Sequence, residues 1–528
     1  MKKGLDAIVK LFTAAAKKKP AEAFAPEENY YDYLIHNSPS ADILNTQVNK
    51  KLPVTPCFRL MIIGNAKSAD KERTLRSISA QTYTGYTLDK DEYDYILYIF
   101  DGDELTADAL FEFACAAQTE PDIIYCDEDY IENGVRSVPI FKPEIREFTL
   151  LSYNMVGRGI MVKRSIHERC AMAGSDDTAQ YAYVLGAVHL ATDYVHIKKP
   201  IYSRCTHENI TDEAIAAIDT HLDSQGTGGY AVPGMYPGSF RISHVTGDVK
   251  VGIVILNCDA LDSLRRLLES VEQNTVYKNY TFIIVDYGSR DARTNRYYEI
   301  LETNKLARIV RCRGYNYPIL ANHGAKRADG DVLVFLGRDT EVISEYWLNA
   351  LLETLNRGAA AAGGKLVDSH GNILFAGGTI GIRGWADSVY RSYPDDTAEL
   401  RRNHFINSIR NVSYISEDCF AIGTDEFFDV GCFDESFERY GADIALCNRL
   451  AQKNHQCVYT PYAVLRHHGE PASAKTATDA DLVRCYDVIR QTLLDGDIHY
   501  NPNYDYSSLQ ARVAVTPYPA IKLNPMYK

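Results

Sequence analysis

The sequence predicts an α/β protein built from two related units in one chain. Apolar runs of strand length alternate with stretches of helical periodicity, the pattern of sheets covered by helices. This alternation starts near residue 57, stops in a Gly- and Pro-rich stretch at residues 226–250, and starts again at residue 251. The 528 residues are also too many for one ordinary domain.

The first unit predicts strands at residues 58–66 and 93–100, with helices at 71–81 and 106–118. A helix at residues 212–225 then leads into the Gly- and Pro-rich stretch, which we interpret as the connection between the units.

The second unit opens with "VGIVILN" at residues 251–257, a continuous apolar strand of the buried parallel type. Asp286 and Asp339 close two later strands, so both acids are expected at the carboxyl edge of one sheet, where ligands of open α/β sheets bind. The other elements expected are helices at 261–273 and 318–328 and strands at 280–286, 307–312 and 331–337.

The two units also form an internal repeat. "LRSISAQTY" resembles "LLESVEQNTVY", and "LYIFDGDEL" resembles "LVFLGRDTE". Ser77 precedes Asp103 by 26 residues, whereas Ser270 precedes Asp339 by 69, so the first copy is 43 residues shorter. It lacks counterparts of the "IIVDYGS" strand and turn and of the "YNYPILANHGAKRA" segment.

Composition excludes some classes of function. The formal net charge of −14 argues against a nucleic-acid binder. Twelve cysteines without a C-x-x-C pair indicate reduced thiols, and we expect a cytoplasmic protein. No apolar run has the length of a membrane span. Residues 1–20 read as a basic amphipathic helix, which either lies on an anionic membrane surface or is an ordinary soluble helix; both remain open.

Three short motifs carry candidate chemistry. Asp286 precedes a Gly-Ser turn, where a carboxylate can accept from a base or ribose and turn amides can face a phosphate. Asp443 lies near a helix start, which favours an ionised general base, although capping alone explains it as well. His467 and His468 end a strand-like run and are either metal ligands or a surface pair.

Taken together and in this order, these motifs resemble the family 2 glycosyltransferases of bacteria, especially the long two-part type that includes rhamnosyltransferases. The first half is similar through "YCDEDYIENGVRSVPIFKPEIREFTLLSYNMVGRG". The second half is similar through "IIVDYGSRD", "YNYPILANHGAKRADGDVLVFLGRDTEV", "EYWLNALL", "FFDVGCFDESF" and "VYTPYAVLRHH", and "GDIHYNPNY" near the C-terminus has a counterpart too.

The resemblance implies a catalytic domain of the GT-A (nucleotide-diphospho-sugar transferase) fold, preceded by a shortened, non-catalytic relative. The expected divisions are 1–56 for a basic helix and connecting segment, 57–223 for the shortened domain, 224–248 for a linker, 249–475 for the catalytic domain, and 476–528 for a C-terminal helix and tail.

It also implies roles for single residues. Asp443 would be the base that deprotonates the acceptor hydroxyl. Asp339 and His467 would bind Mg²⁺ or Mn²⁺, with His468 as the alternative histidine. The expected donor-binding residues are Asn257, Asp286, Gly288, Ser289, Asn322, Arg338 and Asp339.

The implied function is an inverting transfer from a nucleotide sugar, with a UDP- or dTDP-sugar favoured, to a lipid-linked or oligosaccharide acceptor in cell-surface polysaccharide synthesis. Contact with the inner membrane and with other glycan-assembly enzymes would fit this role. The alternative is a catalytically impaired homologue acting as a scaffold in such a complex. A nucleotide-sugar hydrolase or pyrophosphorylase fits less well, because the chain has no Gly-rich phosphate loop with a basic residue.

The sequence departs from the family pattern at several positions. Gly337-Arg338 stands where an acid or amide pair is usual, and Ala445 replaces a second helix acid. Arg338 either clamps phosphate oxygens, points to solvent, or reflects loss of the site. Glu417 and Asp418 occupy usually small positions, close to the expected acceptor side, and have no role assigned by the pattern. Asp101 and Asp103 keep a D-x-D spacing in the first unit, so a second site there is the alternative to a non-catalytic domain.

Overall fold

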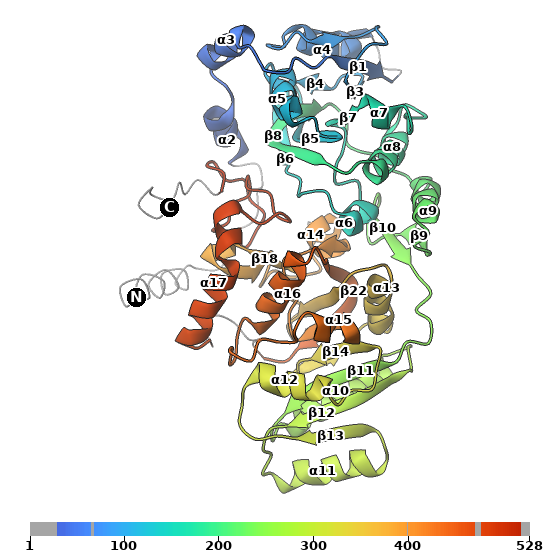
Figure 1. The fold of residues 1–528 in the computed structure, drawn as a ribbon, viewed down its shortest axis with the longest axis vertical. Coiled ribbons are helices and arrows are strands. Elements are labelled where there is room, and N and C mark those ends of the chain that lie inside the picture. Colours follow the sequence, from blue (N-terminus) through green and yellow to red (C-terminus); the bar gives the residue numbers. More distant parts are fainter. Residues whose placement is uncertain (1–28, 65–67, 399, 470–476, 519–528) are drawn as a thin grey trace.

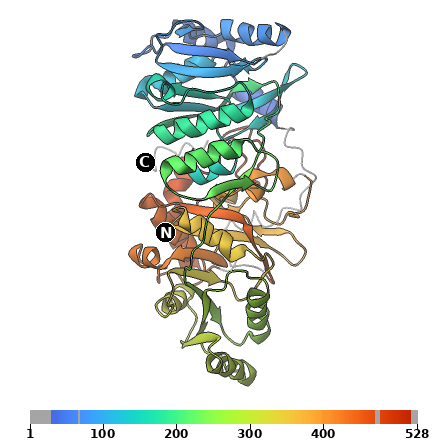
Figure 2. The same cartoon turned by 90° about the vertical axis from the view of Figure 1, so that its right-hand side faces the viewer.

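The computed structural model describes residues 29–64, 68–398, 400–469 and 477–518. The basic helix expected at residues 1–20 lies outside the described residues. The rest forms two α/β units stacked along the long axis of the molecule (Figure 1, Figure 2). The predicted α/β class is therefore confirmed.

The first unit is an eight-stranded mixed sheet with helices packed against it. Its strands are rich in Ile, Tyr and Phe, and all six residues at 95–100 are buried. The elements are β1 (Phe58–Ile63), α4 (Ser68–Ser79), β2 (Tyr86–Thr87), β3 (Tyr95–Phe100), β4 (Glu104–Leu105), α5 (Ala109–Ala116), η1 (Ala117–Thr119), β5 (Ile123–Glu132), β6 (Val135–Ile140), α6 (Glu147–Ser152), β7 (Ile160–Lys163), α7 (Arg164–His167), α8 (Asp177–Leu190) and β8 (Tyr194–Arg204).

The second unit contains a ten-stranded sheet and the larger hydrophobic core. Its elements are β11 (Val251–Asn257), α10 (Leu261–Gln273), β12 (Tyr280–Asp286), α11 (Ala292–Thr303), β13 (Ala307–Arg311), α12 (Tyr317–Ala325), β14 (Val332–Leu336), β15 (Thr340–Val342), α13 (Trp347–Asn356), β16 (Ala361–Val367), β17 (Ile373–Phe375), β18 (Gly378–Ile380), η2 (Ile382–Gly384), β19 (Ala386–Ser388), η3 (Leu400–Arg402), α14 (His404–Asn407), β20 (Arg410–Asn411), β21 (Cys419–Gly423), α15 (Thr424–Asp429), α16 (Ala442–Gln452), β22 (Cys457–His467) and α17 (Asp479–Asp495).

Local sequence explains why the helices cover this sheet. In α10 the apolar side chains recur at helical spacing, so Leu264, Leu267, Leu268 and Val271 are buried on one face. In α12, Gly324 allows close packing: a Cβ there would lie 2.5 Å from Cγ1 of Val254.

The two sheets repeat the same topology. The strand order is β2-β1-β3-β7-β5-β8-β4 in the first unit and β12-β11-β14-β21-β16-β22-β15 in the second, beyond which the second adds β13. The strand directions also agree: β1 with β3 and β11 with β14 are parallel, whereas β3 with β7 and β14 with β21 are antiparallel. The repeat inferred from sequence therefore extends to the whole sheet.

The shorter first copy differs at one edge of its sheet. Where the second unit has the full strand β12, the helix α11 and the strand β13, the first has only the two-residue strand β2. The missing 43 residues therefore correspond to the edge that carries Asp286 in the second unit.

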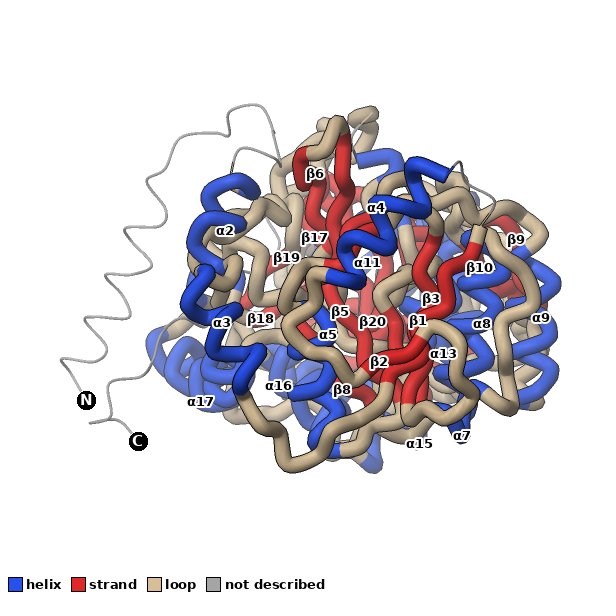
Figure 3. The backbone as a smooth tube through the Cα atoms, turned by 90° about the horizontal axis from the view of Figure 1, so that it is seen from above, coloured by secondary structure: helices blue, strands red, loops and turns tan. Residues whose placement is uncertain are grey.

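The segments expected to be connections contain structure of their own. Helices α2 (Tyr30–Asn37) and α3 (Ala41–Asn49) occupy the stretch before the first unit. Between the units lie α9 (Ala214–Gln225) and a hairpin of β9 (Tyr230–Pro233) and β10 (Phe240–Ser243). Seen along the long axis, α2, α3 and α17 lie on one side of the molecule and α8 and α9 on the other (Figure 3).

The C-terminal segment returns to the first unit. Asn501 and Asn503 both donate their side-chain N–H groups to the buried carboxylate of Asp127, at 3.0 Å. The same carboxylate accepts the backbone N–H of Lys142 at 2.9 Å and lies 2.9 Å from Nε2 of His196. We call this arrangement the clasp; it ties "GDIHYNPNY" to the "CDEDY" strand of the first unit.

Two further features concern membrane-spanning helices and the cysteines. None of the described helices combines the length and apolar character needed to cross a membrane. All twelve cysteines are free thiols.

Candidate functional site

The strand ends of the second unit place the predicted residues at one edge of the sheet. The parallel strands β11 and β12 pair in register, so Asn257 lies beside Asp286. Next to them β14 ends at Leu336, and the loop 337–339 leads into β15. Because Thr340 of β15 pairs with His467 of β22, Asp339 and His467 come together from segments far apart in the sequence.

A cleft of about 180 Å³ opens at this edge. It gathers three predicted residues, Arg338, Asp339 and His467, with two acids, Glu417 and Asp418, whose position the sequence did not explain. The lining side chains are Val254, Leu256, Tyr287, Tyr315, Tyr317, Phe335, Leu336, Gly337, Arg338, Asp339, Glu417, Asp418 and His467.

Arg338 is held at the wall of the cleft and does not point freely into solvent. Its Nη1 donates to the Tyr287 hydroxyl at 2.8 Å, and its Nε lies 3.4 Å from Oδ2 of Asp339. Burial opposes its charge, but Tyr287 and Asp339 outweigh this and raise the pKa of Arg338. The guanidinium is therefore a permanent positive charge beside Asp339, suited to phosphate oxygens.

The two histidines have different environments. Nδ1 of His467 lies 3.1 Å from the carbonyl oxygen of Gly469, which can only accept, so Nδ1 carries a proton. Its Nε2 faces the cleft, 3.7 Å from Oδ2 of Asp418. His468 instead bonds Glu341 at 2.7 Å through its ring, and its backbone N–H donates to the carbonyl of Asp339. His467 is thus the histidine of the cleft.

Three carboxyl groups lie near one another at the cleft: Glu417 and Asp418 in its lining, and Asp443 next to Glu417. The backbone N–H of Glu417 donates to Oδ2 of Asp443 at 3.4 Å. Burial raises the pKa of Asp443 to about 6, against the hydrogen bonds from the backbone N–H groups of Ile444 and Glu417. Burial also raises the pKa of Asp418, and it raises that of Glu417 well above its usual value, with repulsion from Asp443 and Asp418. Asp443 therefore gains or loses its proton near neutral pH, as a general base must.

The predicted donor residues on β11 and β12 are more enclosed. Asp286 is 4% exposed, accepts the Ser289 N–H at 2.9 Å and lies 3.7 Å from Arg311. Gly288 has φ +116°, which allows this turn. Asn257 is fully buried; its Nδ2 donates to Tyr298, and its Oδ1 has no hydrogen-bond partner among the described residues.

Asn322 is not brought to the cleft. Its side-chain amide donates to the carbonyl of Phe433 and accepts the N–H of the same residue. The structure therefore gives Asn322 the role of joining α12 to the loop after α15.

The acids of the first unit are engaged within the protein. Asp103 is fully buried and accepts from Arg158 at 3.0 Å, from the Tyr202 hydroxyl at 2.8 Å and from the Cys205 N–H at 2.8 Å. Burial raises its pKa, although Arg158 opposes this. With this carboxylate already satisfied, the geometry favours a structural role for Asp103 over the alternative second site at Asp101 and Asp103.

A divalent cation fits the chemistry of the cleft only in part. No group of three or more His, Cys, Asp or Glu side chains in the described part of the chain is preformed as a metal cage. Mg²⁺, however, is commonly bound by one or two carboxylates, with substrate phosphates and water completing the shell. Asp339, Asp418 and His467 line the cleft and provide such a set.

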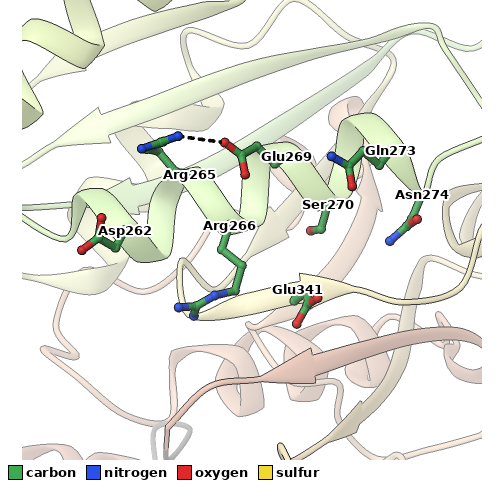
Figure 4. Close-up of a pocket in the computed structure, with 8 residues that line it drawn as sticks. All are labelled: Asp262, Arg265, Arg266, Glu269, Ser270, Gln273, Asn274 and Glu341. Atoms are coloured by element: carbon green, nitrogen blue, oxygen red, sulfur yellow. Dashed lines mark hydrogen bonds and ion pairs between the residues drawn. The ribbon is translucent and has the colours of Figure 1, made fainter.

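A second, larger depression of about 340 Å³ lies between α10 and β15 (Figure 4). Its lining is mainly charged surface of α10, including the Arg265–Glu269 ion pair at 3.3 Å, and Glu341 on its edge already bonds Arg466 and His468. It brings together none of the predicted site residues.

Sequence patterns missed the aromatic wall of the cleft. The rings of Tyr287 and Tyr315 pack edge to face with centroids 5.4 Å apart, next to Arg338. The positions of these tyrosines, directly after Asp286 and within "YNYP", could have indicated a stacking surface for a planar ligand.

Comparison with known proteins gives the following similarities. Residues 251–417 match the family described as Glycosyl transferase family 2. The chain is 29% identical over 431 residues to the O-antigen biosynthesis protein RfbC of Myxococcus xanthus, covering 78% of this chain and 34% of that protein. It is 30% identical over 406 residues to the uncharacterized protein y4gI of Sinorhizobium fredii, covering 71% of this chain and 44% of that one. The chain thus spans less than half the length of these relatives.

A solved structure, GalNAc-T7 with UDP, GalNAc and Mn²⁺, aligns at 18% identity with a TM-score of 0.36, covering 46% of this chain and 48% of that one.

Proposed function

We propose that this chain, whose residues 251–417 match glycosyl transferase family 2, transfers a sugar from a nucleotide-sugar donor to a glycan acceptor with inversion at the anomeric carbon. The observation that carries this proposal is the cleft at the strand ends. There a fixed cation, Arg338, lies beside Asp339, and Glu417 of the same lining donates its backbone N–H to Asp443, a buried carboxylate whose pKa is about 6.

The proposed mechanism is a single displacement. Asp443 takes the proton of the acceptor hydroxyl, whose oxygen forms a bond to the anomeric carbon as the bond from that carbon to the diphosphate oxygen breaks. Arg338 stabilises the negative charge that develops on the departing diphosphate. The wall formed by Tyr287 and Tyr315 offers a face for the nucleobase, and Asp286 and Ser289 order the turn beside it.

A divalent cation, Mg²⁺ or Mn²⁺, would be held by Asp339 and His467 together with the donor diphosphate. When bound it would neutralise charge on the leaving group. Arg338 supplies part of the same charge, which supports a lower requirement for metal than in a site without a cation.

The acceptor and the pathway are proposed from the relatives. The Myxococcus xanthus relative is named for O-antigen biosynthesis, which supports a bacterial surface polysaccharide as the product and a lipid-linked glycan as the acceptor. A UDP- or dTDP-sugar is our proposed donor. Peripheral contact with the inner membrane would use the basic segment at residues 1–20, so removal of this segment should abolish binding to anionic liposomes.

The first test is nucleotide binding, which needs no acceptor. Melting curves are recorded with UDP, dTDP, GDP and CMP, with and without Mn²⁺. A nucleotide at ~100 times its dissociation constant stabilises the fold by about 2.7 kcal/mol. Arg338→Ala should abolish the shift, whereas Arg265→Ala, on exposed α10, should leave it unchanged. Absence of any shift in the wild type would contradict the proposed function.

A scaffold without catalysis is the second candidate, favoured by the contact of Arg338 with Asp339 and by Ala445. It predicts that the nucleotide sugar is neither transferred nor slowly hydrolysed, even where nucleotide binding is detected. Hydrolysis of a bound UDP- or dTDP-sugar that is lost in Asp443→Asn would exclude it.

A further inference from the structure

The loop after β14 has lost a side chain at a position where the first unit keeps an acid. In the repeated sequence, Gly337 of "LGRDTE" corresponds to Asp101 of "FDGDEL". A Cβ built on Gly337 would fall onto Oδ1 of Asp418, and the Gly337 N–H donates to the carbonyl of Asp418 at 3.2 Å. The carboxylate of Asp418 therefore fills the space that a side chain at residue 337 would occupy.

The first unit treats the same edge of its sheet differently. There the loop before β7 supplies Arg158, which forms an ion pair with Asp103 at 3.0 Å. In the second unit the topologically equivalent loop, before β21, supplies Glu417 and Asp418 instead. The acid after β3 is thus paired with a cation from within the protein, whereas the equivalent loop in the second unit supplies two further carboxyl groups.

His467 and Asp418 also face each other in the cleft. With its proton on Nδ1, His467 presents the lone pair of Nε2 toward Oδ2 of Asp418, 3.7 Å away. When His467 is neutral and Asp418 is ionised, both atoms are acceptors, and a cation between them would satisfy both. Arg338 is the only Lys or Arg among the residues that line the cleft, and its donors are directed at Tyr287 and Asp339.

We propose that Asp418 is a third protein ligand of the divalent cation, binding it with Asp339 and His467 in the place that residue 337 leaves vacant. The ligand class is Mg²⁺ or Mn²⁺ complexed with a nucleoside diphosphate, since carboxylates with one imidazole suit these ions and phosphates complete the shell. This inference rests on the proposed function of the same cleft.

The test measures cation binding and does not depend on transfer. Mn²⁺ is titrated into the protein, alone and with UDP, and free Mn²⁺ is followed by EPR. Asp418→Asn keeps the size of the side chain and should weaken Mn²⁺ binding by about tenfold or more, at least the loss typical of residues that support metal ligands. Glu417→Gln is the matched control, changing the adjacent acid in the same loop, and should change the affinity by less than that.

A double variant that moves the acid from residue 418 to residue 337 distinguishes the loss of a metal ligand from a general loss of folding. Gly337→Asp alone should not improve cation binding, because the new side chain would overlap the carboxylate of Asp418. Gly337→Asp combined with Asp418→Gly returns the acid to the β14 loop and should recover most of the wild-type Mn²⁺ affinity.

The inference would be overturned by unchanged Mn²⁺ affinity in Asp418→Asn, or by an equal loss in Glu417→Gln. Wild-type protein that binds UDP but no Mn²⁺ would also overturn it while leaving the transferase proposal intact. Failure of the proposed function looks different, since no nucleotide would then bind in either the presence or the absence of Mn²⁺.

Discussion

Asp443→Asn should make the protein more stable while it removes the proposed base. The carboxyl is 8% exposed and its pKa rises from 3.8 to about 6 on folding, chiefly through burial. A carboxyl with a raised pKa holds its proton more tightly in the folded chain. The contribution of the Asp443 carboxyl to the free energy of unfolding is therefore fully present below pH 3.8 and is lost as the pH rises through about 6.

The size of the effect follows from these two pKa values. Replacing the ionisable group by a neutral amide should raise the free energy of unfolding by up to about 3 kcal/mol at pH 8, but only by about 1.6 kcal/mol at pH 5. The Asn oxygen can still accept the Ile444 N–H that Asp443 accepts at 2.8 Å. A more stable variant would show that the ionisable carboxyl of Asp443 lowers the stability of the wild-type fold, as expected for a residue retained for function.

The assay compares melting temperatures of variant and wild type at pH 5 and pH 8. We expect a higher melting temperature for the variant, with the larger difference at pH 8. Asp262→Asn, in the exposed first turn of α10, controls for loss of a carboxylate near a helix start and should show no such gain. A variant that is less stable than wild type at pH 8, or equally improved at both pH values, would refute the reasoning.

Three further predictions test other parts of the molecule. Because Asp443 must be ionised to act as a base, transfer or donor hydrolysis at subsaturating substrate should fall about tenfold from pH 7 to pH 5; a flat profile would remove Asp443 from that role. Asp127→Ala removes one acceptor from each of the amides of Asn501 and Asn503, which keep only the carbonyls of Lys142 and Lys198; an unpaired buried N–H costs about 1–3 kcal/mol, so hydrogen exchange in residues 497–513 should accelerate. Asp505→Ala on the same segment is the control, and equal exchange in the two variants would contradict the clasp. Gly324→Ala places a Cβ 2.5 Å from Val254 and 2.9 Å from Val285, so overpacking should lower stability by about 1–3 kcal/mol; an unchanged melting temperature would show that α12 moves freely.

The parts of the fold that depend on local patterns could be predicted from the sequence. The alternation of strand and helix patterns predicted β11, β12 and β14. The similarity of "LYIFDGDEL" to "LVFLGRDTE" predicted the internal repeat that the two sheets share. The pairing of Asp339 with His467 was expected only from the family resemblance, and the structure brings the two together through the pairing of β15 with β22. The match of residues 251–417 to the family described as Glycosyl transferase family 2 agrees with the GT-A type of fold expected for this half.

Features that depend on long-range packing could not be predicted. The position of Asp418 against Gly337 is set by the antiparallel pairing of β21 with β14, which no local pattern encodes. Asn322 looked like a donor ligand by motif, yet its amide joins α12 to Phe433. The D-x-D spacing at Asp103 gave no hint that Arg158, 55 residues later, would satisfy the carboxylate.

The clasp can form only after Asn501 and Asn503 have been synthesised. Asp127 and Asn501 are separated by 374 residues, so the carboxylate exists long before its partner is made. At about 5–20 residues per second, roughly 20–75 s pass on the ribosome between the two. During that interval the strand β5 carries a charged side chain without its final ligands. The first unit therefore cannot reach its final structure until the last part of the described chain has been made. Nascent chains stalled after residue 475 should remain sensitive to protease in the first unit as well as in the second.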